Sequence, residues 1–336
     1  MTADSKVVVV VVGATGKQGG SVARSLLQNK NFQVRCITRS PTSAKAKELA
    51  RLGAEICQAD GFNEADLLRA FNGGWGAFVN TNSEDPVCSS LELASNGRTD
   101  EELGKNIVRC AALAGVQHLV YSSGAPSHEL TNGGVHIPGL DMKAKVEQFA
   151  RATPAFQTVT PIIAAWFMEN MLEAEYADLF GGFPLLQDSD GYLTYKTPFW
   201  SLKEDFPWIS IADDFGDLVH GIFLQPLRWN RRVVQAVGAI TSSAEVVNTF
   251  ASVTGKKARF IPLVDPFEMK TLSTHWREQE RDAFIFSQLR DGEFFGNGPT
   301  ETETATALKK AAFEAKGRQG SATLMTVREF FQREFT

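Results

Sequence analysis

The sequence predicts an α/β protein in which a doubly wound parallel sheet is followed by a smaller C-terminal α+β lobe. Apolar runs typical of buried strands alternate with segments of helical periodicity up to Thr160, and such alternation requires crossover connections and therefore parallel strands. After Thr160 the alternation stops, and aromatic residues and prolines crowd residues 183–208. We therefore expect a first domain over residues 1–160 and a smaller lobe over residues 161–336, partly interleaved and without a clean linker.

The first strand is expected at residues 7–12, a run of valines that ends in a glycine. An unbroken β-branched run of this kind is typical of a parallel strand that is buried on both faces. Apolar residues then recur at helical spacing over residues 18–27, so the first strand turns directly into a helix. The other expected elements of the first domain are strands at 32–38, 54–58, 76–80, 118–122 and 156–160, and helices at 44–52, 64–71, 101–114 and 141–151. In the lobe we expect helices at 242–254, 308–316 and 326–335, and a loop at 296–304.

The composition limits the classes of partner. The chain has 336 residues, of which 43% are hydrophobic, and these can fill a core. Its net charge of −5 gives no positive field for phosphate backbones, so we expect no nucleic-acid partner. The cysteines lie more than twenty residues apart, unlike those of a metal or redox site, and no apolar run is long enough for a membrane span or a signal peptide. We expect a cytoplasmic protein without a metal or a membrane contact.

The strongest functional signal is a glycine-rich loop between the first strand and the first helix. It reads Gly13-Ala14-Thr15-Gly16-Lys17-Gln18-Gly19, with the spacing G-x-x-G-x-x-G. In a Rossmann domain the first glycine permits a tight turn, the second lets the backbone approach a pyrophosphate, and the third allows close packing of helix on strand. The loop therefore predicts dinucleotide binding. Its expected cofactor-binding residues are Gly13, Thr15, Gly16, Lys17, Gln18 and Gly19.

The end of the second strand predicts which dinucleotide binds. Many NAD-specific sites carry an acid there for the ribose 2′-hydroxyl, whereas this chain reads Thr38-Arg39-Ser40-Pro41. An arginine at this place can form a fork onto a 2′-phosphate, and such charge-assisted hydrogen bonds contribute roughly 1.5–3 kcal/mol each. We therefore expect NADP(H), bound by Arg39 and Ser40, although a solvated surface arginine is the alternative. Asp60, after the third strand, either binds the adenine amino group or caps the next helix.

Several further segments, taken in order with the glycine loop and Arg39, resemble the NmrA-like family of atypical short-chain dehydrogenase/reductases. They are Asn80-Thr81-Asn82, Tyr121-Ser122-Ser123, Asp141-Met142-Lys143, the segment 166–170 and the segment 211–217. The likeness covers about residues 6–262. It implies a Rossmann domain with a small C-terminal lobe and NAD(P) across the carboxyl ends of the strands. The further cofactor-binding residues that it implies are Asn80, Thr81, Asn82, Tyr121 and Lys143.

The resemblance also implies an unusual catalytic centre. Ordinary short-chain dehydrogenases transfer a proton with a Tyr-x-x-x-Lys pair, but the residue four positions before Lys143 is Gly139. Lys143 matches the lysine that the family holds near the nicotinamide ribose, with an exposed helix lysine as the alternative. Ser122 and Asp141 lie near the predicted strand ends and complete the expected catalytic set. A substrate that needs no proton, such as an iminium ion, suits a site without the tyrosine.

The aromatic segment of the lobe predicts an apolar substrate pocket over the nicotinamide. We expect the pocket to be lined by Trp166, Phe167, Tyr192, Tyr195, Phe199, Trp200 and Trp208, with packing in the core as the alternative for each one. Together the features predict an NADPH-dependent oxidoreductase of secondary metabolism that reduces a hydrophobic imine or iminium ion, enone or carbonyl compound. The alternative within the same family is an NADP(H)-sensing regulator that binds a protein partner and has no turnover.

Overall fold

The computed structural model describes residues 6–83, 85, 88 and 98–336, and it is built around a parallel seven-stranded sheet. The strand order is β10-β6-β5-β4-β1-β2-β3. The strands are β1 (Val7–Val11), β2 (Phe32–Thr38), β3 (Glu55–Gln58), β4 (Gly76–Val79), β5 (His118–Ser122), β6 (Thr158–Ala164) and β10 (Val234–Ala236). Without β10 this is the 3-2-1-4-5-6 order of a Rossmann fold, in which ligands bind where the order reverses between β1 and β4.

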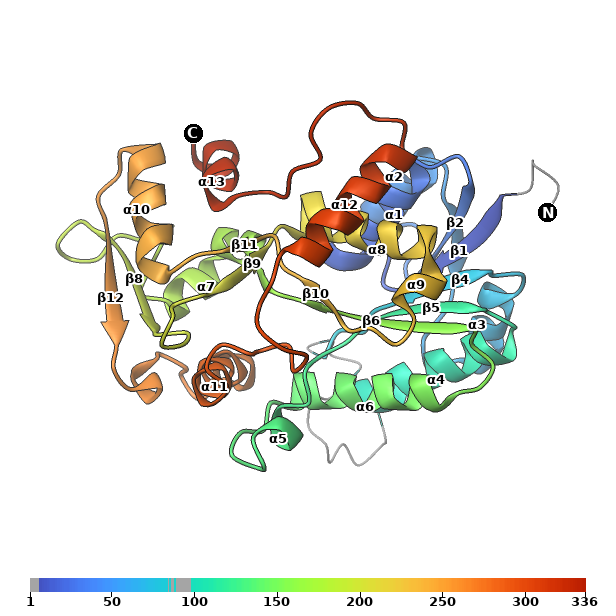
Figure 1. The fold of residues 1–336 in the computed structure, drawn as a ribbon, viewed down its shortest axis with the longest axis horizontal. Coiled ribbons are helices and arrows are strands. Elements are labelled where there is room, and N and C mark those ends of the chain that lie inside the picture. The colour runs from blue at the N-terminus through green and yellow to red at the C-terminus, as the bar shows by residue number, and fades with distance from the viewer. Residues whose placement is uncertain (1–5, 84, 86–87, 89–97) are drawn as a thin grey trace.

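Helices cover both faces of this sheet, as Figure 1 shows. One face carries α3 (Glu64–Phe71), α4 (Asp100–Leu113) and α6 (Pro138–Ala152). The opposite face carries α1 (Lys17–Leu27), α2 (Ala44–Arg51), α8 (Gly216–Leu224) and α12 (Glu303–Ala315), with α8 packed against both α1 and α12. The predicted doubly wound parallel sheet is therefore confirmed.

Two expected bounds in the first half differ most from the structure. Helix α6 begins at Pro138 rather than at residue 141, because a proline in the first turn has no N–H to lose and its fixed φ suits a helix start. Strand β6 runs on to Ala164 because its last residues pair in register with β10, which comes from the second half of the chain. The sequence predicted no strand at 234–236. The division expected at residue 160 therefore falls inside β6, and the second half supplies β10, α8 and α12 to the sheet and its cover.

The remaining elements form a lobe at the other end of the molecule (Figure 1). It holds a three-stranded sheet of β7 (Trp166–Phe167), β9 (Pro207–Ile209) and β11 (Ala239–Ile240), and a pair of β8 (Leu193–Pro198) with β12 (Ala258–Leu263). Its main helices are α7 (Ala174–Leu179), α10 (Ser243–Thr254), α11 (His275–Leu289) and α13 (Val327–Phe335). The short helices α5 (Ser127–Leu130) and α9 (Pro226–Trp229) belong to the connections around the large sheet.

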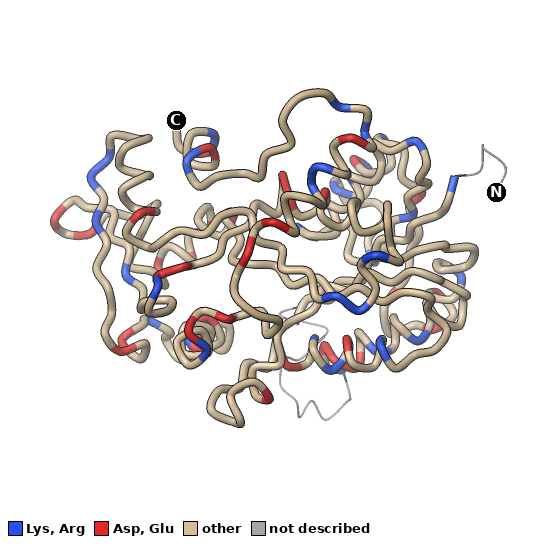
Figure 2. The backbone as a smooth tube through the Cα atoms, viewed as in Figure 1, with Lys and Arg blue, Asp and Glu red and all other residues tan. Residues whose placement is uncertain are grey.

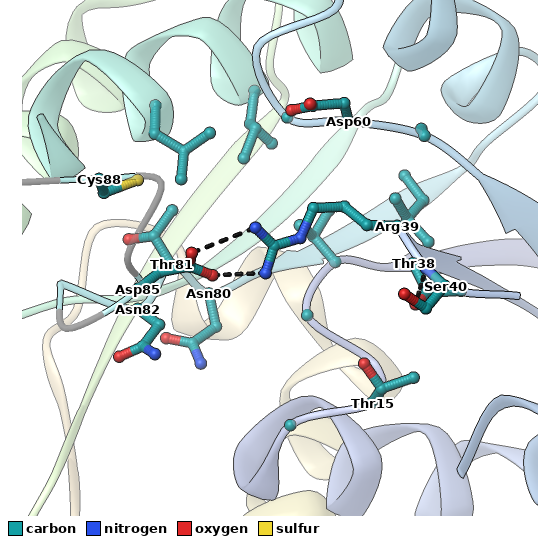
Figure 3. Close-up of a pocket in the computed structure, with 18 of the residues that line it drawn as sticks. Thr15, Thr38, Arg39, Ser40, Asp60, Asn80, Thr81, Asn82, Asp85 and Cys88 are labelled. Carbon is teal, nitrogen blue, oxygen red and sulfur yellow. Dashed lines mark hydrogen bonds and ion pairs between the residues drawn. The ribbon is translucent and has the colours of Figure 1, made fainter. Parts of the chain in front are cut away.

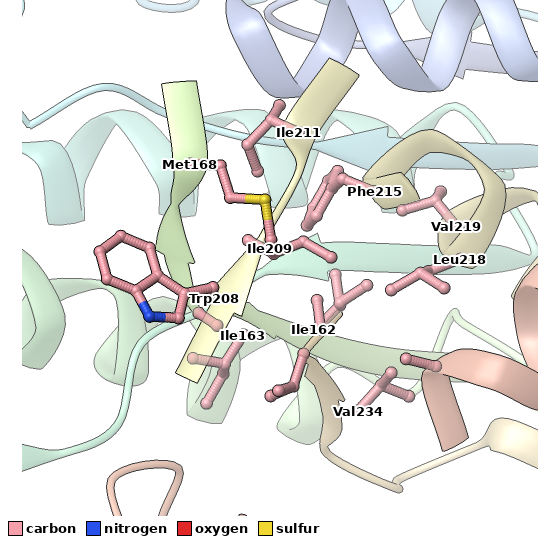
Figure 4. Close-up of a cluster of buried hydrophobic side chains, with 14 of the residues drawn as sticks. Ile162, Ile163, Met168, Trp208, Ile209, Ile211, Phe215, Leu218, Val219 and Val234 are labelled. Atoms are coloured by element: carbon pink, nitrogen blue, oxygen red, sulfur yellow. The ribbon is translucent and has the colours of Figure 1, made fainter. Parts of the chain in front are cut away.

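One apolar core joins the lobe to the large sheet. Ile162 and Ile163 of β6 pack with Met168 and Trp208 of the lobe and with Phe215, which precedes α8 (Figure 4). A second cluster fills the space between the sheet and the face covered by α3, α4 and α6. Because the first cluster is continuous from β1 to α13, the lobe and the large sheet share one hydrophobic core.

The charged residues are distributed over both halves of the chain. Lys and Arg alternate with Asp and Glu around the molecule instead of gathering on one element (Figure 2).

In the part of the chain that the structure describes, no helix has the length and apolar character needed to cross a bilayer.

Candidate functional site

The glycine loop makes the tight turn that its sequence predicts. Gly13 has a φ of +71°, a value that glycine adopts without strain, and Gly16 donates its N–H to the Gly13 carbonyl at 2.9 Å. A Cβ atom on Gly19 would overlap the Gly13 carbonyl, so the third glycine lets α1 pack against the loop. The N-cap of α1 is Gly16, which has no side chain to bond the first-turn N–H groups. These groups are therefore available to a phosphate.

A cavity of about 510 Å³ lies beside the loop at the carboxyl ends of β1 to β4 (Figure 3). We call it the nucleotide cavity. Apolar side chains such as Ile37, Leu67 and Ile107 supply walls for a flat base, and the loop supplies backbone N–H groups. Among the residues predicted to bind the cofactor, those that line this cavity are Gly13, Thr15, Gly16, Arg39, Ser40, Asp60, Asn80, Thr81 and Asn82.

Arg39 extends across the nucleotide cavity from the end of β2 (Figure 3). Its guanidinium forms a two-pronged ion pair with the carboxylate of Asp85, which follows β4. The hydrogen bond with Asp85 raises the pKa of Arg39, so the arginine is a permanent cation in the wall of the cavity. No local pattern in the sequence indicates that a carboxylate pairs with Arg39.

Lys143 lies at the boundary of the nucleotide cavity, in the second turn of α6. Its Nζ donates to the carbonyl oxygen of Thr81 at 2.8 Å and to the Thr81 hydroxyl at 3.0 Å. The same Nζ lies 3.4 Å from a carboxylate oxygen of Asp100, which is completely buried at the start of α4. The Lys143 side chain is only 14% exposed. The alternative reading of an exposed helix lysine is therefore wrong.

A second cavity, of about 430 Å³, has Lys143 in its lining. We call it the aromatic cavity, because aromatic side chains of the lobe form much of its wall: Trp166, Phe167, Tyr176, Trp276 and Phe294. Lys17 and Lys143 line it on the side of the large sheet, and Glu280 and Gln279 of α11 line it on the side of the lobe. The Tyr176 hydroxyl donates to the Glu280 carboxylate at 2.9 Å. The two cavities share no lining residue, but they are neighbours, because Lys143 of the aromatic cavity bonds Thr81 of the nucleotide cavity.

Comparison with known proteins identifies the family. The chain matches the model of the NmrA-like family over residues 5–294. It is 51% identical over 331 residues to the NmrA-like family domain-containing oxidoreductase himF of Aspergillus japonicus, and the match covers 98% of each chain. The chain belongs to the NmrA-like family.

Solved structures share the fold of this NmrA-like protein at low identity. NmrA, a negative transcriptional regulator, in complex with NADP is 21% identical and covers 99% of this chain and 96% of its own, with a TM-score of 0.71. The NADPH-dependent quinone oxidoreductase QOR2 of Escherichia coli, in complex with NADPH, is 17% identical and covers 98% of this chain and 100% of its own, with a TM-score of 0.65. One fold therefore serves a regulator and an enzyme.

Five residues predicted to bind the cofactor lie outside the lining of the nucleotide cavity: Lys143, described above, and four others. Lys17 lines the aromatic cavity and forms an ion pair with Glu173 at 3.2 Å. Gln18 accepts a hydrogen bond from the Ser122 hydroxyl at 2.7 Å. Gly19 packs within the loop, and Tyr121 is buried in the core cluster beneath α4 and α6, where burial raises the pKa of its phenol. The last residues of a parallel strand point alternately to its two faces, which explains the position of Tyr121.

Two predicted acids have structural partners. Asp60 lines the nucleotide cavity and accepts the Phe62 N–H at 2.9 Å, while the side chain of Asn63 caps α3, so Asp60 is not the helix cap. Asp141 lies in neither of the two cavities. Its carboxylate accepts from the Ser127 hydroxyl at 3.0 Å and pairs with His136 Nδ1 at 2.7 Å, which ties α5 and its loop to α6. Of the predicted catalytic residues Lys143, Ser122 and Asp141, Lys143 lines the aromatic cavity and the other two line neither cavity.

Five of the seven aromatic residues predicted for the substrate pocket do not line the aromatic cavity. Trp166 and Phe167 do line it. Trp200, Trp208 and Tyr195 are at most 3% exposed and pack in the core of the lobe. The remaining two are Tyr192, whose ring is covered by the Arg259 guanidinium at 4.7 Å, and Phe199, which is 44% exposed. The alternative of core packing holds for the buried residues, because a large ring gains the most hydrophobic free energy when it is fully removed from water.

The sequence missed the part of the site that α11 supplies. Gly139 faces this helix: its N–H donates to the Gln279 side-chain oxygen at 2.8 Å, and a Cβ at Gly139 would lie 2.9 Å from that oxygen. A side chain at position 139 would require the Gln279 side chain to shift. Helix α11 of the lobe therefore lies against the position that carries the tyrosine in ordinary short-chain dehydrogenases, a relation between residues 140 positions apart that no local pattern reveals.

Proposed function

We propose that this NmrA-like protein is an NADPH-dependent reductase of a hydrophobic small molecule in secondary metabolism. The observation that carries the proposal is that the aromatic cavity lies next to the nucleotide cavity, with Lys143 of the first bonded to Thr81 of the second. An enzyme needs a cavity of organic size against the reactive end of its cofactor, whereas a regulator that only senses the dinucleotide does not. The similarity to a relative named as an oxidoreductase supports the same choice.

The residues of the nucleotide cavity fit NADP(H). The uncapped N–H groups of α1 suit a pyrophosphate, the apolar walls suit adenine, and the guanidinium of Arg39 suits a 2′-phosphate. The complexes of the two structural neighbours with NADP and NADPH support this assignment. When bound, NADPH would supply a hydride to the substrate.

Lys143 positions the cofactor in this proposal. Its ammonium group is fixed between Thr81 and Asp100, so it presents a positive charge at the entrance to the aromatic cavity without the freedom of a surface lysine. That charge can orient the nicotinamide ribose. The residue four positions before Lys143 is Gly139, so the lysine lacks the sequence-adjacent phenol of a Tyr-x-x-x-Lys pair, and the phenol in the lining of this cavity is that of Tyr176, which bonds Glu280.

The aromatic cavity can accept a positively charged substrate, because its two lysines are each paired with a carboxylate, Lys17 with Glu173 and Lys143 with Asp100. Glu280 places a carboxylate among aromatic rings, and the Tyr176 hydroxyl holds that carboxylate in place. A carboxylate and aromatic faces both attract a cation, and an iminium ion accepts hydride without a proton. An iminium ion therefore suits this cavity better than an enone or a ketone does. It also suits a site that lacks the Tyr-x-x-x-Lys pair.

The proposal is tested by NADPH oxidation with three panels of compounds: cyclic N-methyl iminium salts, whose charge does not titrate, and matched enones and ketones. We expect turnover of iminium salts at a rate nearly independent of pH over the range in which histidine or tyrosine would titrate. Glu280→Gln should raise KM for iminium salts about tenfold, because one charge-assisted contact is lost. KM for any neutral substrate should change by less than about twofold.

The competing function has its own outcome in this experiment. No oxidation of NADPH with any compound, together with a protein partner whose binding depends on the dinucleotide, would contradict the reductase and support a regulator. Reduction of ketones alone, at a rate that changes with pH as a proton donor titrates, would support a reductase with a proton donor and contradict the iminium substrate.

A further inference from the structure

The ion pair between Arg39 and Asp85 lies inside the nucleotide cavity. Arg39 Nη1 lies 3.1 Å from one carboxylate oxygen of Asp85 and Nη2 lies 2.5 Å from the other, so both prongs of the guanidinium are engaged. Both side chains line the cavity, and Figure 3 shows that they meet across it from the ends of β2 and β4. The Asp85 side chain is 17% exposed and that of Arg39 is 53% exposed.

A ribose 2′-phosphate would use the same two prongs. A guanidinium binds a carboxylate and a phosphate in the same planar, two-pronged geometry, so one edge of Arg39 cannot hold both. An unmodified ribose has no anion to offer and leaves the pair in place. The carboxylate also carries a negative charge that repels an incoming phosphate.

We propose that Asp85 occupies the 2′-phosphate position on Arg39 and that NADP(H) has to displace it to bind. The proposal rests on the proposed NADP(H) binding, and it assigns to Asp85 the size of the preference for NADPH over NADH. Each binding of NADPH breaks one ion pair to form another, whereas NADH binds without this exchange. Asp85 therefore lowers the preference that Arg39 alone would give.

The test is a comparison of NADPH and NADH binding by titration calorimetry in the full-length protein and four variants. Asp85→Asn should tighten NADPH binding about twofold to fivefold, which is the effect of losing an exposed competing ion pair, and should leave NADH binding unchanged. Arg39→Ala should abolish the preference for NADPH. In the double variant Arg39→Ala/Asp85→Asn the effect of Asp85 on NADPH should disappear, because the shared guanidinium is absent.

Asp60→Asn is the matched control, since it removes a carboxylate that acts on Arg39 through its charge and is not part of the ion pair on the guanidinium. It should tighten NADPH binding less than Asp85→Asn does, because it releases no ion pair on the guanidinium. The fragments 2′,5′-ADP and 5′-AMP, titrated in the same way, should reproduce the Asp85→Asn effect for the first and not for the second.

Three outcomes would overturn the inference. Unchanged NADPH affinity in Asp85→Asn shows that the phosphate does not compete with Asp85. Weaker NADH binding in that variant shows that Asp85 bonds the ribose hydroxyls instead. An Asp85 effect that persists in the Arg39→Ala background shows that it does not act through the guanidinium. The absence of any dinucleotide binding to the unaltered protein would overturn the proposed function as well, so the two failures are distinguishable.

Discussion

The nucleotide cavity and the aromatic cavity are built in different ways. The first is assembled from the glycine loop and the ends of neighbouring strands, all between Val12 and Ile107, and much of its chemistry is backbone chemistry. The second is assembled from side chains of separate segments between Lys17 and Phe294. A short motif determines the first cavity, whereas the second depends on how the lobe packs. The first should tolerate changes in the lobe, and the second should not.

The largest expected effect separates tryptophans that hold the lobe from those that line the aromatic cavity. Trp200 is completely buried, with its ring 4.6 Å from that of Phe206. Trp200→Ala should lower the free energy of unfolding by about 3–5 kcal/mol because it leaves a large void. Trp276→Ala, in the cavity wall, should cost clearly less stability and raise KM for the substrate. Urea unfolding measures the loss of stability, and steady-state kinetics measures KM. A larger loss of stability in Trp276→Ala than in Trp200→Ala would contradict the assignment of these two rings.

The next largest effect concerns the glycine loop. A Cβ at Gly16 would lie 3.2 Å from the Gly13 carbonyl, a contact that a small shift relieves, but its side chain would face the phosphates. Gly16→Val should therefore fold and lose about 100-fold in affinity for both dinucleotides, equivalent to one or two charge-assisted hydrogen bonds. Gly19→Ala, whose Cβ overlaps the Gly13 carbonyl, should instead lower Tm. Circular dichroism and calorimetry distinguish them, and a folded Gly16→Val variant with unchanged affinity would place the phosphates elsewhere.

Lys143 tests the boundary between the two cavities. Lys143→Met should weaken NADPH binding roughly tenfold, because one charged contact is lost. It should also lower turnover about 100-fold, because the nicotinamide is misplaced. Lys145→Met, two positions along the same helix and 46% exposed, is the control and should change neither quantity by more than about twofold. If Lys143→Met weakens binding but leaves turnover intact, the lysine does not position the reactive end of the cofactor.

A smaller effect tests how the second half of the chain is attached to α1. His220 of α8 is completely buried, accepts the Asn29 amide at Nε2 (2.9 Å), and bonds the Ser25 hydroxyl at Nδ1 (3.1 Å). Burial, helped by the charge of Lys316, lowers the pKa of His220 to about 4. The folded pKa lies below the unfolded value, so stability is full above about pH 6.5 and is lost as the pH falls toward 4.

We therefore expect His220 to reduce the free energy of unfolding by about 2 kcal/mol between pH 7.5 and pH 5. Urea unfolding at the two pH values measures the loss, and His220→Gln should remove that part of the pH dependence. An equal pH dependence in the two proteins would show that His220 is not the group that titrates.

The large sheet could be predicted from the sequence because its signals are local. The valine run and the glycine spacing each determine the conformation of a few consecutive residues, and Arg39 lies at a fixed place after β2. Strand β10 carried no such signal: it has three residues and forms only because β6 offers an open edge.

The aromatic cavity could be predicted only in part, because aromatic residues favour burial whether or not they line a site. Trp166 and Phe167 lie directly after β6 and line the cavity, whereas Trp200 and Trp208 fill the core behind it. Helical periodicity can place residues 275–289 on a helix, but it does not reveal that Gln279 meets Gly139. Asp85 was missed for the same reason, since its partner Arg39 is 46 positions away.

The central claim is that the two cavities act together in hydride transfer, and the most direct measurement is transfer of the label from NADPH. The protein is incubated separately with the two C4-deuterated epimers of NADPH and an iminium salt, and the product is analysed by mass spectrometry and NMR. We predict that one epimer delivers its deuterium to the former iminium carbon of a single product stereoisomer, and that the other epimer delivers hydrogen. Unlabelled product with both epimers, or no product with any compound of the three panels, would contradict the account.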